Sequence, residues 1–306
     1  MKRAPLIAAA FALAACSEQA PGSLSVESAD GYVEGSSNPP RSLPAYFDCL
    51  RERGFTAISA HRGGPAPGFA ENAIPTFEST LREAPGAFLE VDVSQTADGV
   101  LVLMHDDRAE RTTTGSGAIA EMDMAQLLSF QLEDERGRLV DARVPTLAEA
   151  LEWADGKTVL ELDIKRGIAY EDVISAVSAA NAMSRVIFVT YSVDGAARLA
   201  RLAPQAMIYT TISNVRELDT LDRRGVDLTR IVAWAGTDTP PASLVEALAA
   251  RGVETRFGMF GAGRDYANAL RARAQIVAVD DAQQAARDID AADGEEGLAS
   301  IQCARG

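Results

Sequence analysis

Short apolar runs alternate with amphipathic segments along most of this 306-residue chain. Such alternation indicates parallel strands joined by crossover helices, in a sheet that is either doubly wound or closed into a barrel. Strands are predicted over residues 55–60, 87–93, 100–105, 158–164, 185–191, 206–211, 230–234, 253–259 and 275–280. Helices are predicted over residues 44–54, 72–84, 146–154, 170–183, 194–202, 213–224, 241–251, 264–273 and 281–291.

Nine predicted strands are one more than an eight-stranded barrel requires. The turn Ala97-Asp98-Gly99 leaves no room for a helix between two neighbouring runs, so the surplus strand is expected within residues 93–105. The stretch 106–145, rich in Thr, Gly, Glu and Arg, is predicted to be a small insertion after the third strand.

Polar residues cluster at the ends of the predicted strands. In a barrel these ends converge on one face, where the active sites of this fold lie. A doubly wound sheet would concentrate its chemistry at one switch point, and no Gly-x-Gly-x-x-Gly follows the first strand. The sequence therefore favours a (β/α)8 TIM barrel. The strand-end residues are His61, Glu90, Asp92, His105, Asp163 and Lys165.

The chemistry of these side chains suits metal-assisted cleavage of a phosphate ester. Attack on a phosphodiester builds negative charge on the phosphoryl oxygens, which a divalent ion on carboxylate ligands stabilises. A nucleophilic hydroxyl needs a base and a departing alkoxide needs an acid, roles that two histidines can fill. The chain contains only two histidines, His61 and His105. A formal charge of −15 disfavours a nucleic-acid partner.

Several motifs, taken together, resemble the glycerophosphodiester phosphodiesterase family of phospholipase C-like phosphodiesterase barrels. The resemblance lies in their order and spacing and covers about residues 55 to 290. The motifs are His61-Arg62-Gly63, Glu71-Asn72, Glu90-Val91-Asp92, Asp98-Gly99, His105-Asp106, Arg111-Thr112-Thr113-Thr114-Gly115, Asp163-Ile164-Lys165 and Asp280.

The resemblance implies hydrolysis of glycerophosphodiesters to glycerol 3-phosphate and an alcohol. His61 and His105 match the family's paired general base and acid. One divalent metal ion, Ca²⁺ or Mg²⁺, would be bound by Glu90, Asp92 and Asp163.

Other positions carry open alternatives. Arg62 and Lys165 match the family's phosphate-binding cations, or they are structural partners of the acids. Asp163 stands where the family commonly has Glu, so Glu161, two residues earlier on the same face, is an alternative third ligand. Glu71 matches the acid of the family's Glu-Asn-Thr element and is a possible further site acid, and the segment Arg111 to Gly115 serves either loop capping or substrate contact. Asp280 is expected to be a structural acid at the barrel lip. The segment Thr255 to Met259 replaces the family's Trp-Thr-Val-Asn segment, so the preferred head group is left undetermined.

Two other functions remain as alternatives. One is a phospholipase of the same barrel superfamily, acting on lyso- or phosphatidylinositol lipids. The other is a non-catalytic lipoprotein that binds a phosphate ligand. Against the second, His61 and His105 both retain side chains competent for catalysis.

The amino terminus predicts export. Met1-Lys2-Arg3 is followed by an apolar stretch too short to span a bilayer, and Leu13-Ala14-Ala15-Cys16 resembles the lipobox of bacterial lipoproteins. We therefore expect a signal peptide over 1–15, a lipidated Cys16, a flexible tether over 16–45 and a barrel domain over 46–306. The mature chain would be anchored to a bacterial membrane, facing the periplasm or the cell exterior.

Two cysteines remain after Cys16. Cys49 precedes the first predicted strand and Cys303 follows the last predicted helix. In an oxidising compartment an even pair favours a disulfide. In a closed barrel the first and last strands are neighbours, so the flanking segments can meet. A Cys49–Cys303 disulfide is therefore predicted on the face opposite the active site.

Overall fold

The computed structural model describes residues 39–295 and 298–304. The predicted signal peptide, Cys16 and most of the predicted tether lie outside these residues. In the part of the chain that the structure describes, no helix combines the length and apolar character needed to cross a membrane.

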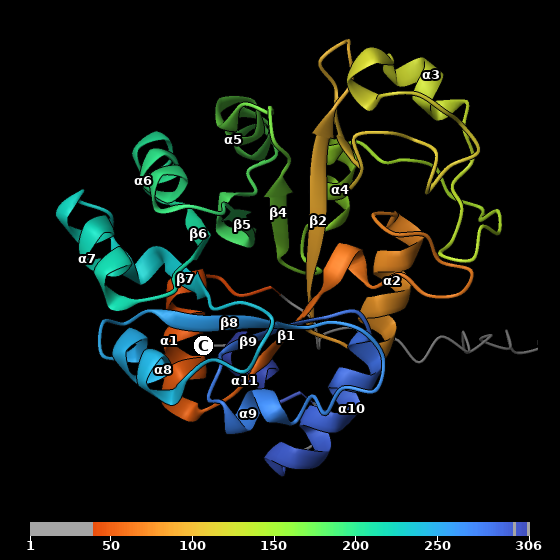
Figure 1. The fold of residues 1–306 in the computed structure, drawn as a ribbon. Coiled ribbons are helices and arrows are strands. Elements are labelled where there is room, and N and C mark those ends of the chain that lie inside the picture. Colours follow the sequence, from red (N-terminus) through yellow and green to blue (C-terminus); the bar gives the residue numbers. More distant parts are fainter. Residues whose placement is uncertain (1–38, 296–297, 305–306) are drawn as a thin grey trace, which may run out of the picture. The chain divides into compact units, whose positions relative to one another are not determined.

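Eight parallel strands close into a barrel, which confirms the predicted fold class (Figure 1). Neighbours around the barrel follow the order β1-β9-β8-β7-β6-β5-β4-β2, and the pairing of Ser59 with Phe88 joins β1 to β2 and closes the ring. The barrel strands are β1 (Ala57–Ala60), β2 (Phe88–Gln95), β4 (Leu160–Ile164), β5 (Val186–Val189), β6 (Met207–Thr211), β7 (Ile231–Trp234), β8 (Glu254–Met259) and β9 (Ile276–Val279).

The ninth strand, β3 (Leu101–Leu103), is the surplus strand that the sequence predicted. It pairs antiparallel with the end of β2, where Val93 faces Leu103. Gly99 adopts φ 82° in the intervening turn, a conformation that favours glycine because it has no Cβ. This hairpin carries His105 to the carboxyl end of the barrel.

Helices cover the outer face of the barrel, as expected for a protein whose parallel strands are buried on both faces. Helix α5 ends four residues before its prediction, and Asn181 adopts φ 50° just beyond it, which stops the helical path. Helix α9 begins four residues after its predicted start, and the remaining predicted helices lie within two residues of their expected bounds. The predicted helices that the structure contains are α1 (Leu43–Arg53), α2 (Ile74–Glu83), α4 (Leu147–Trp153), α5 (Tyr170–Ala179), α6 (Val193–Leu202), α7 (Val215–Arg223), α8 (Ala242–Ala249), α9 (Asn268–Arg271) and α10 (Ala282–Asp293).

The apolar residues of the insertion between β3 and α4 pack into a small core that they share with β3 and the loop after β1. Helix α3 (Met124–Leu128) was not predicted, because five residues are too few to show helical periodicity. Leu127 and Ile119 are buried within the insertion, together with Leu132 and Ala109. The insertion is therefore an ordered layer beside the mouth of the barrel (Figure 1).

The amino-terminal end of the barrel is closed by α1 and α11 (Ser300–Ala304). Cys49 and Cys303 form a disulfide with a Cα–Cα distance of 5.7 Å, which confirms the predicted pair. The predicted domain boundary at residue 46 is three residues late: α1 begins at Leu43, because the side chain of Ser42 accepts a hydrogen bond from the backbone N–H of Ala45.

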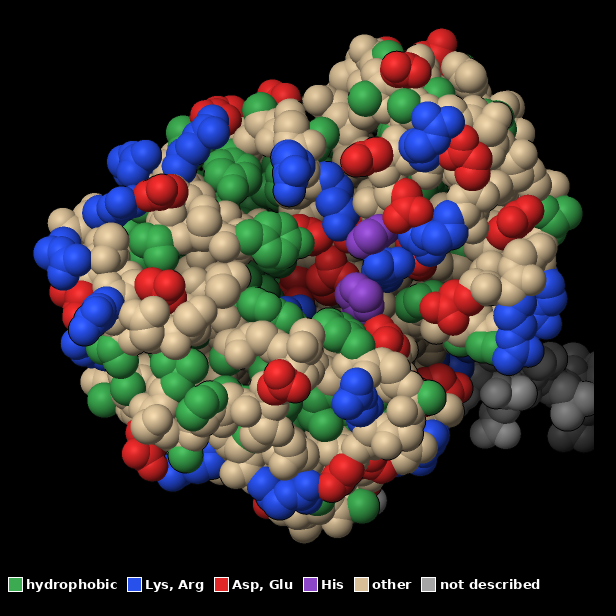
Figure 2. All heavy atoms as spheres, viewed as in Figure 1, with side chains coloured by type: hydrophobic (Ala, Val, Ile, Leu, Met, Phe, Trp, Pro, Cys, Tyr) green, Lys and Arg blue, Asp and Glu red, His purple; other side chains and the backbone are tan. Residues whose placement is uncertain are grey.

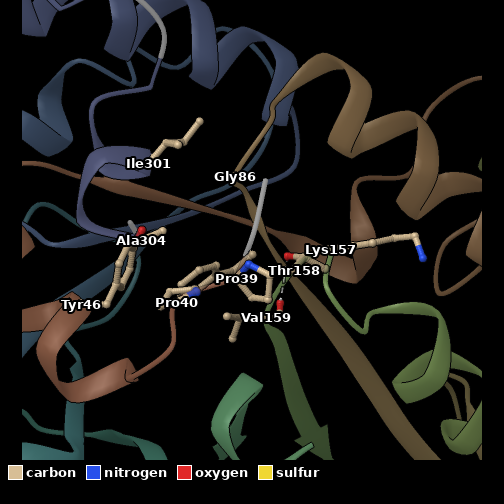
Figure 3. Close-up of a pocket in the computed structure, with 10 residues that line it drawn as sticks. Pro39, Pro40, Tyr46, Gly86, Lys157, Thr158, Val159, Ile301 and Ala304 are labelled. Carbon is tan, nitrogen blue, oxygen red and sulfur yellow. Dashed lines mark hydrogen bonds between the residues drawn. The ribbon is translucent and has the colours of Figure 1, made fainter. Parts of the chain in front are cut away.

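The first described residues pack on this same end. Pro39 and Pro40 line a small cavity with Tyr46, Phe88 and Val159 (Figure 3). Pro40 is buried there. The chain therefore enters the barrel at the end opposite the carboxyl ends of the strands.

Reduction of the Cys49–Cys303 disulfide should lower the melting temperature and leave turnover at room temperature nearly unchanged. The bond joins residues 254 positions apart, so it restricts the unfolded chain by about 5 kcal/mol in the entropy model. Calorimetry of the oxidised chain and of the Cys49→Ser/Cys303→Ser double variant measures this difference. Titration of two accessible thiols in the native protein would contradict the bond.

Candidate active site

Three carboxylates from two neighbouring strands meet at the carboxyl end of the barrel. Glu90 and Asp92 lie on β2, and Asp163 lies on β4 directly opposite Asp92 in the strand register. Alternation along each strand turns all three inward. They are buried, and each offers an oxygen within 4.8 Å of the others'. Figure 2 shows acidic side chains in the hollow at the mouth, with the two histidines at its edge.

This acidic triad (Glu90, Asp92 and Asp163) fits a hard divalent cation. Its donors are all carboxylate oxygens, which Ca²⁺ and Mg²⁺ prefer. Oδ1 of Asp163 is buried without a hydrogen-bond partner in the protein. Burial raises the pKa of Glu90 well above its ordinary value, and the charges of Asp92 and Asp163 raise it further. A cation would satisfy the buried oxygen and relieve the repulsion.

Asn72 fixes one member of the triad. Its side-chain Nδ2 donates to Oδ2 of Asp92 at 2.7 Å, and the backbone N–H of Asp92 donates to Oδ1 of Asn72 at 2.9 Å. Asn72 adopts φ 58°, a left-handed conformation that asparagine tolerates better than most residues. The Glu71-Asn72 motif therefore supports the carboxylate geometry from the loop after β1.

Both cations predicted to bind phosphate are paired with acids in this structure. The ammonium of Lys165 lies 2.6 Å from Oδ1 of Asp92 and 2.7 Å from Oδ2 of Asp163. Nη1 of Arg62 lies 2.9 Å from Oε2 of Glu71. Carboxylate partners therefore fix the positions of both cations, Lys165 against two members of the triad and Arg62 against Glu71.

His61 directly follows β1 in a short 3-10 turn, η1 (His61–Gly63). Its Nδ1 lies 2.8 Å from Oδ1 of Asp280, which follows β9, and the other oxygen of Asp280 accepts from the backbone N–H of Gly261. The hydrogen bond from His61 lowers the pKa of Asp280 below its ordinary value. Asp280, expected to be a structural acid at the barrel lip, therefore orients the His61 ring.

His105 is held in the same way by a different carboxylate. Its Nδ1 lies 2.6 Å from Oδ1 of Asp106. Asp106 also accepts from Nε of Arg111 at 2.6 Å, and this bond lowers the pKa of Asp106 to about 2. With Nδ1 of each histidine engaged by a carboxylate, Nε2 is the nitrogen left to meet a substrate.

Glu161 lies on β4 opposite Glu90 in the strand register, two residues before Asp163. It is fully buried and bonded to Ser59, Tyr209 and Arg256, with Nη2 of Arg256 at 2.8 Å. Asp163, and not Glu161, joins Glu90 and Asp92. The alternative ligand left open by the sequence is therefore placed in a structural ion pair.

Sequence reasoning did not identify Arg256 as part of the site. Its guanidinium lies 4.9 Å from the ring centres of both Tyr209 and Trp234, and Trp234 packs against Phe260. Phe260 in turn lies 4.7 Å from the His61 ring. The available signal was an arginine inside an apolar strand, because such a residue is almost never buried without a partner.

Comparison with known proteins agrees with this geometry. Residues 61–277 match the model of the glycerophosphoryl diester phosphodiesterase family. This chain belongs to that family. A solved family structure from Parabacteroides distasonis is 27% identical, with a TM-score of 0.75 over 83% of this chain and 94% of that one. An Oleispira antarctica phosphodiesterase, solved with the product sn-glycerol-3-phosphate, shares the fold at 21% identity and a TM-score of 0.63, covering 78% of this chain and 99% of that one.

Curated relatives match over a shorter stretch. A glycerophosphodiester phosphodiesterase of Caldanaerobacter subterraneus is 30% identical over 160 residues, which cover 50% of this chain and 65% of that protein. The uncharacterized protein YqiK of Bacillus subtilis is 34% identical over 157 residues, which cover 49% of this chain and 64% of that protein. The matched stretch thus spans just under two thirds of the length of each relative.

Asp163→Asn and Glu161→Gln should damage different properties. Asp163→Asn should weaken metal affinity, measured by calorimetric titration with Ca²⁺ or Mg²⁺, with little loss of stability. Glu161→Gln leaves the buried Arg256 without its anion and should cost roughly 3–5 kcal/mol in the free energy of unfolding. The reverse pattern would identify Glu161 as the ligand.

Proposed function

We propose that this protein hydrolyses glycerophosphodiesters to glycerol 3-phosphate and an alcohol. The observation that carries the proposal is the buried acidic triad, accompanied by two histidines whose Nδ1 atoms are fixed by carboxylates. Family membership supports this reaction class, and so does the product bound to the Oleispira antarctica neighbour.

A divalent ion, Ca²⁺ or Mg²⁺, would be held by Glu90, Asp92 and Asp163. When bound, it supplies positive charge against the negative charge that develops on the phosphoryl oxygens. Arg62 and Lys165, held beside the triad, bind the phosphate of the diester and orient it. Each pairs with a carboxylate, so its position is fixed before substrate arrives.

The two histidines move protons at Nε2. One takes the proton of the attacking hydroxyl, which is the substrate's own glycerol 2-hydroxyl, and the other gives a proton to the oxygen of the departing alcohol. Water then opens the resulting cyclic phosphate to glycerol 3-phosphate, with the two proton transfers reversed. This requires opposite protonation states in one site, which histidine permits because its ordinary pKa lies near neutrality. Asp280 and Asp106 keep the two rings in one orientation through the cycle.

The decisive experiment measures turnover of glycerophosphocholine, other glycerophosphodiesters and lysophospholipids by the purified chain. We expect hydrolysis of the water-soluble diesters, loss of activity on chelation, and recovery with added Ca²⁺ or Mg²⁺. His61→Ala and His105→Ala should each lower turnover by roughly 10²–10⁴-fold, since each removes an acid or base. Circular dichroism of both variants checks that they fold.

Other outcomes would point elsewhere. Faster hydrolysis of lysophospholipids would favour the phospholipase alternative. Phosphate-ligand binding without turnover by the metal-loaded chain would favour a non-catalytic lipoprotein. Near-wild-type turnover in either histidine variant would contradict the acid–base assignment.

We further propose that the chain is exported and anchored through a lipid on Cys16. The Cys49–Cys303 disulfide supports an oxidising compartment. Fractionation tests the proposal: the wild-type chain should stay with the membranes, and Cys16→Ser should not. Equal distribution of both would contradict a lipid on Cys16.

A further inference from the structure

A continuous series of hydrogen bonds runs from Glu71 through Arg111 and Asp106 to His105. We infer that these three residues form a positioning relay, which fixes the His105 ring and couples it to the phosphate-binding Arg62. The inference rests on the proposed function, because it gives His105 a proton-transfer role. It also assigns a role to Arg111, for which the sequence left loop capping and substrate contact open.

The guanidinium of Arg111 joins two carboxylates at once. Nε and Nη2 lie 2.6 and 3.0 Å from the two oxygens of Asp106. Nη1 and Nη2 lie 2.8 and 2.7 Å from the two oxygens of Glu71. Because a guanidinium is planar and rigid, two bidentate contacts fix both carboxylates relative to each other. Neither loop capping nor substrate contact requires that arrangement.

Glu71 connects this relay to the phosphate site. Its Oε2 accepts from Nη1 of Arg62 at 2.9 Å as well as from Arg111. Burial opposes ionisation of Glu71, yet the hydrogen bonds from Arg111 and Arg62 lower its pKa below the ordinary value. Glu71 is therefore an ionised carboxylate that accepts hydrogen bonds from both Arg62 and Arg111.

The relay gives His105 a different electrostatic environment from His61. The carboxylate beside His105 shares its charge with a guanidinium, whereas Asp280 beside His61 is bonded to a backbone N–H. Arg111 is supplied by the segment after β3, so the insertion side of the mouth contributes directly to the position of a proposed catalytic ring. Removing Arg111 should thus affect His105 and leave His61 nearly unchanged.

Two substitutions should shift the titration midpoint of His105 in opposite directions. Arg111→Gln removes a positive charge and should raise the midpoint at which His105 titrates. Asp106→Asn removes the negative charge and should lower that midpoint. Arg108→Gln is the matched control, because Arg108 lies in the same segment, is exposed and pairs with Glu110. It should shift neither histidine.

The measurement is direct because the chain has only two histidines. NMR of the full chain, purified without a histidine tag, should show two titrating imidazole resonances, assigned with His61→Gln and His105→Gln. The Arg108→Gln control separates the effect of the Arg111 and Asp106 substitutions at the His105 ring from a general change of charge in the segment. Imidazole ¹⁵N shifts report whether the hydrogen stays on Nδ1.

Activity provides an independent readout. Arg111→Gln should lower kcat by roughly 10–100-fold with little change in KM, as is typical when an orienting partner is lost. Glu71→Gln should lower kcat and also raise KM, because Glu71 holds Arg62 too. Arg111→Lys keeps the positive charge but loses the bidentate hydrogen bonds of the guanidinium. The titration midpoint of His105 should therefore stay close to that of the wild type, while kcat should fall.

The outcomes separate this inference from the proposed function. A lower melting temperature in Arg111→Gln, with kcat, KM and the His105 titration unchanged, would show that Arg111 only pins the loop and would overturn the relay. Wild-type turnover in His105→Ala would overturn the proposed acid–base role, while opposite midpoint shifts would still establish the relay.

Discussion

The burial of negative charge inside the barrel is the constraint on which the rest of the site depends. Glu90, Asp92, Asp163 and Glu161 point inward from two adjacent strands. Lys165 and Arg256 are the cations paired with them in the described part of the chain. Four ionised carboxylates and two cations leave two negative charges without a partner, and a divalent cation would neutralise both. Without such compensation, buried carboxylates take up protons, as the raised pKa of Glu90 indicates.

The barrel separates stability from chemistry along its axis. At the amino-terminal end, α1, α11 and the disulfide cover an aromatic cluster of Tyr46, Phe47 and Phe88. At the carboxyl end, strand termini and the loops after them carry the polar side chains. This division is typical of the fold, because the loops can vary while the packed strands hold their geometry. Changes at one end are therefore expected to leave the other end intact.

The two histidines occupy similar positions but are supported by different parts of the chain. Asp280 follows the last strand and reaches His61 because β9 pairs with β1. Asp106 and Arg111 belong to the segment after β3. Asp106 contacts His105, and Arg111 reaches Glu71 in the loop after β1. One ring is thus positioned by barrel closure and the other by the segment that opens the insertion. Two independently supported rings suit a mechanism in which the two perform different proton transfers.

The sequence alone determined the order of strands and helices, the surplus strand, the inward-facing acids and the cysteine pair. Each follows from a local pattern or from the closure of a barrel. Tertiary structure decided which partner each charged group takes. Glu161 and Asp163 share a face of β4, and strand alternation cannot separate them. Arg256, 95 residues away, forms an ion pair with Glu161, so Asp163 is the residue of β4 that joins the triad. Likewise, Asp280 meets His61 across 219 residues and Arg111 meets Glu71 across 40. Such pairings depend on which side chains the closed barrel brings within hydrogen-bonding distance, and no local periodicity encodes that distance.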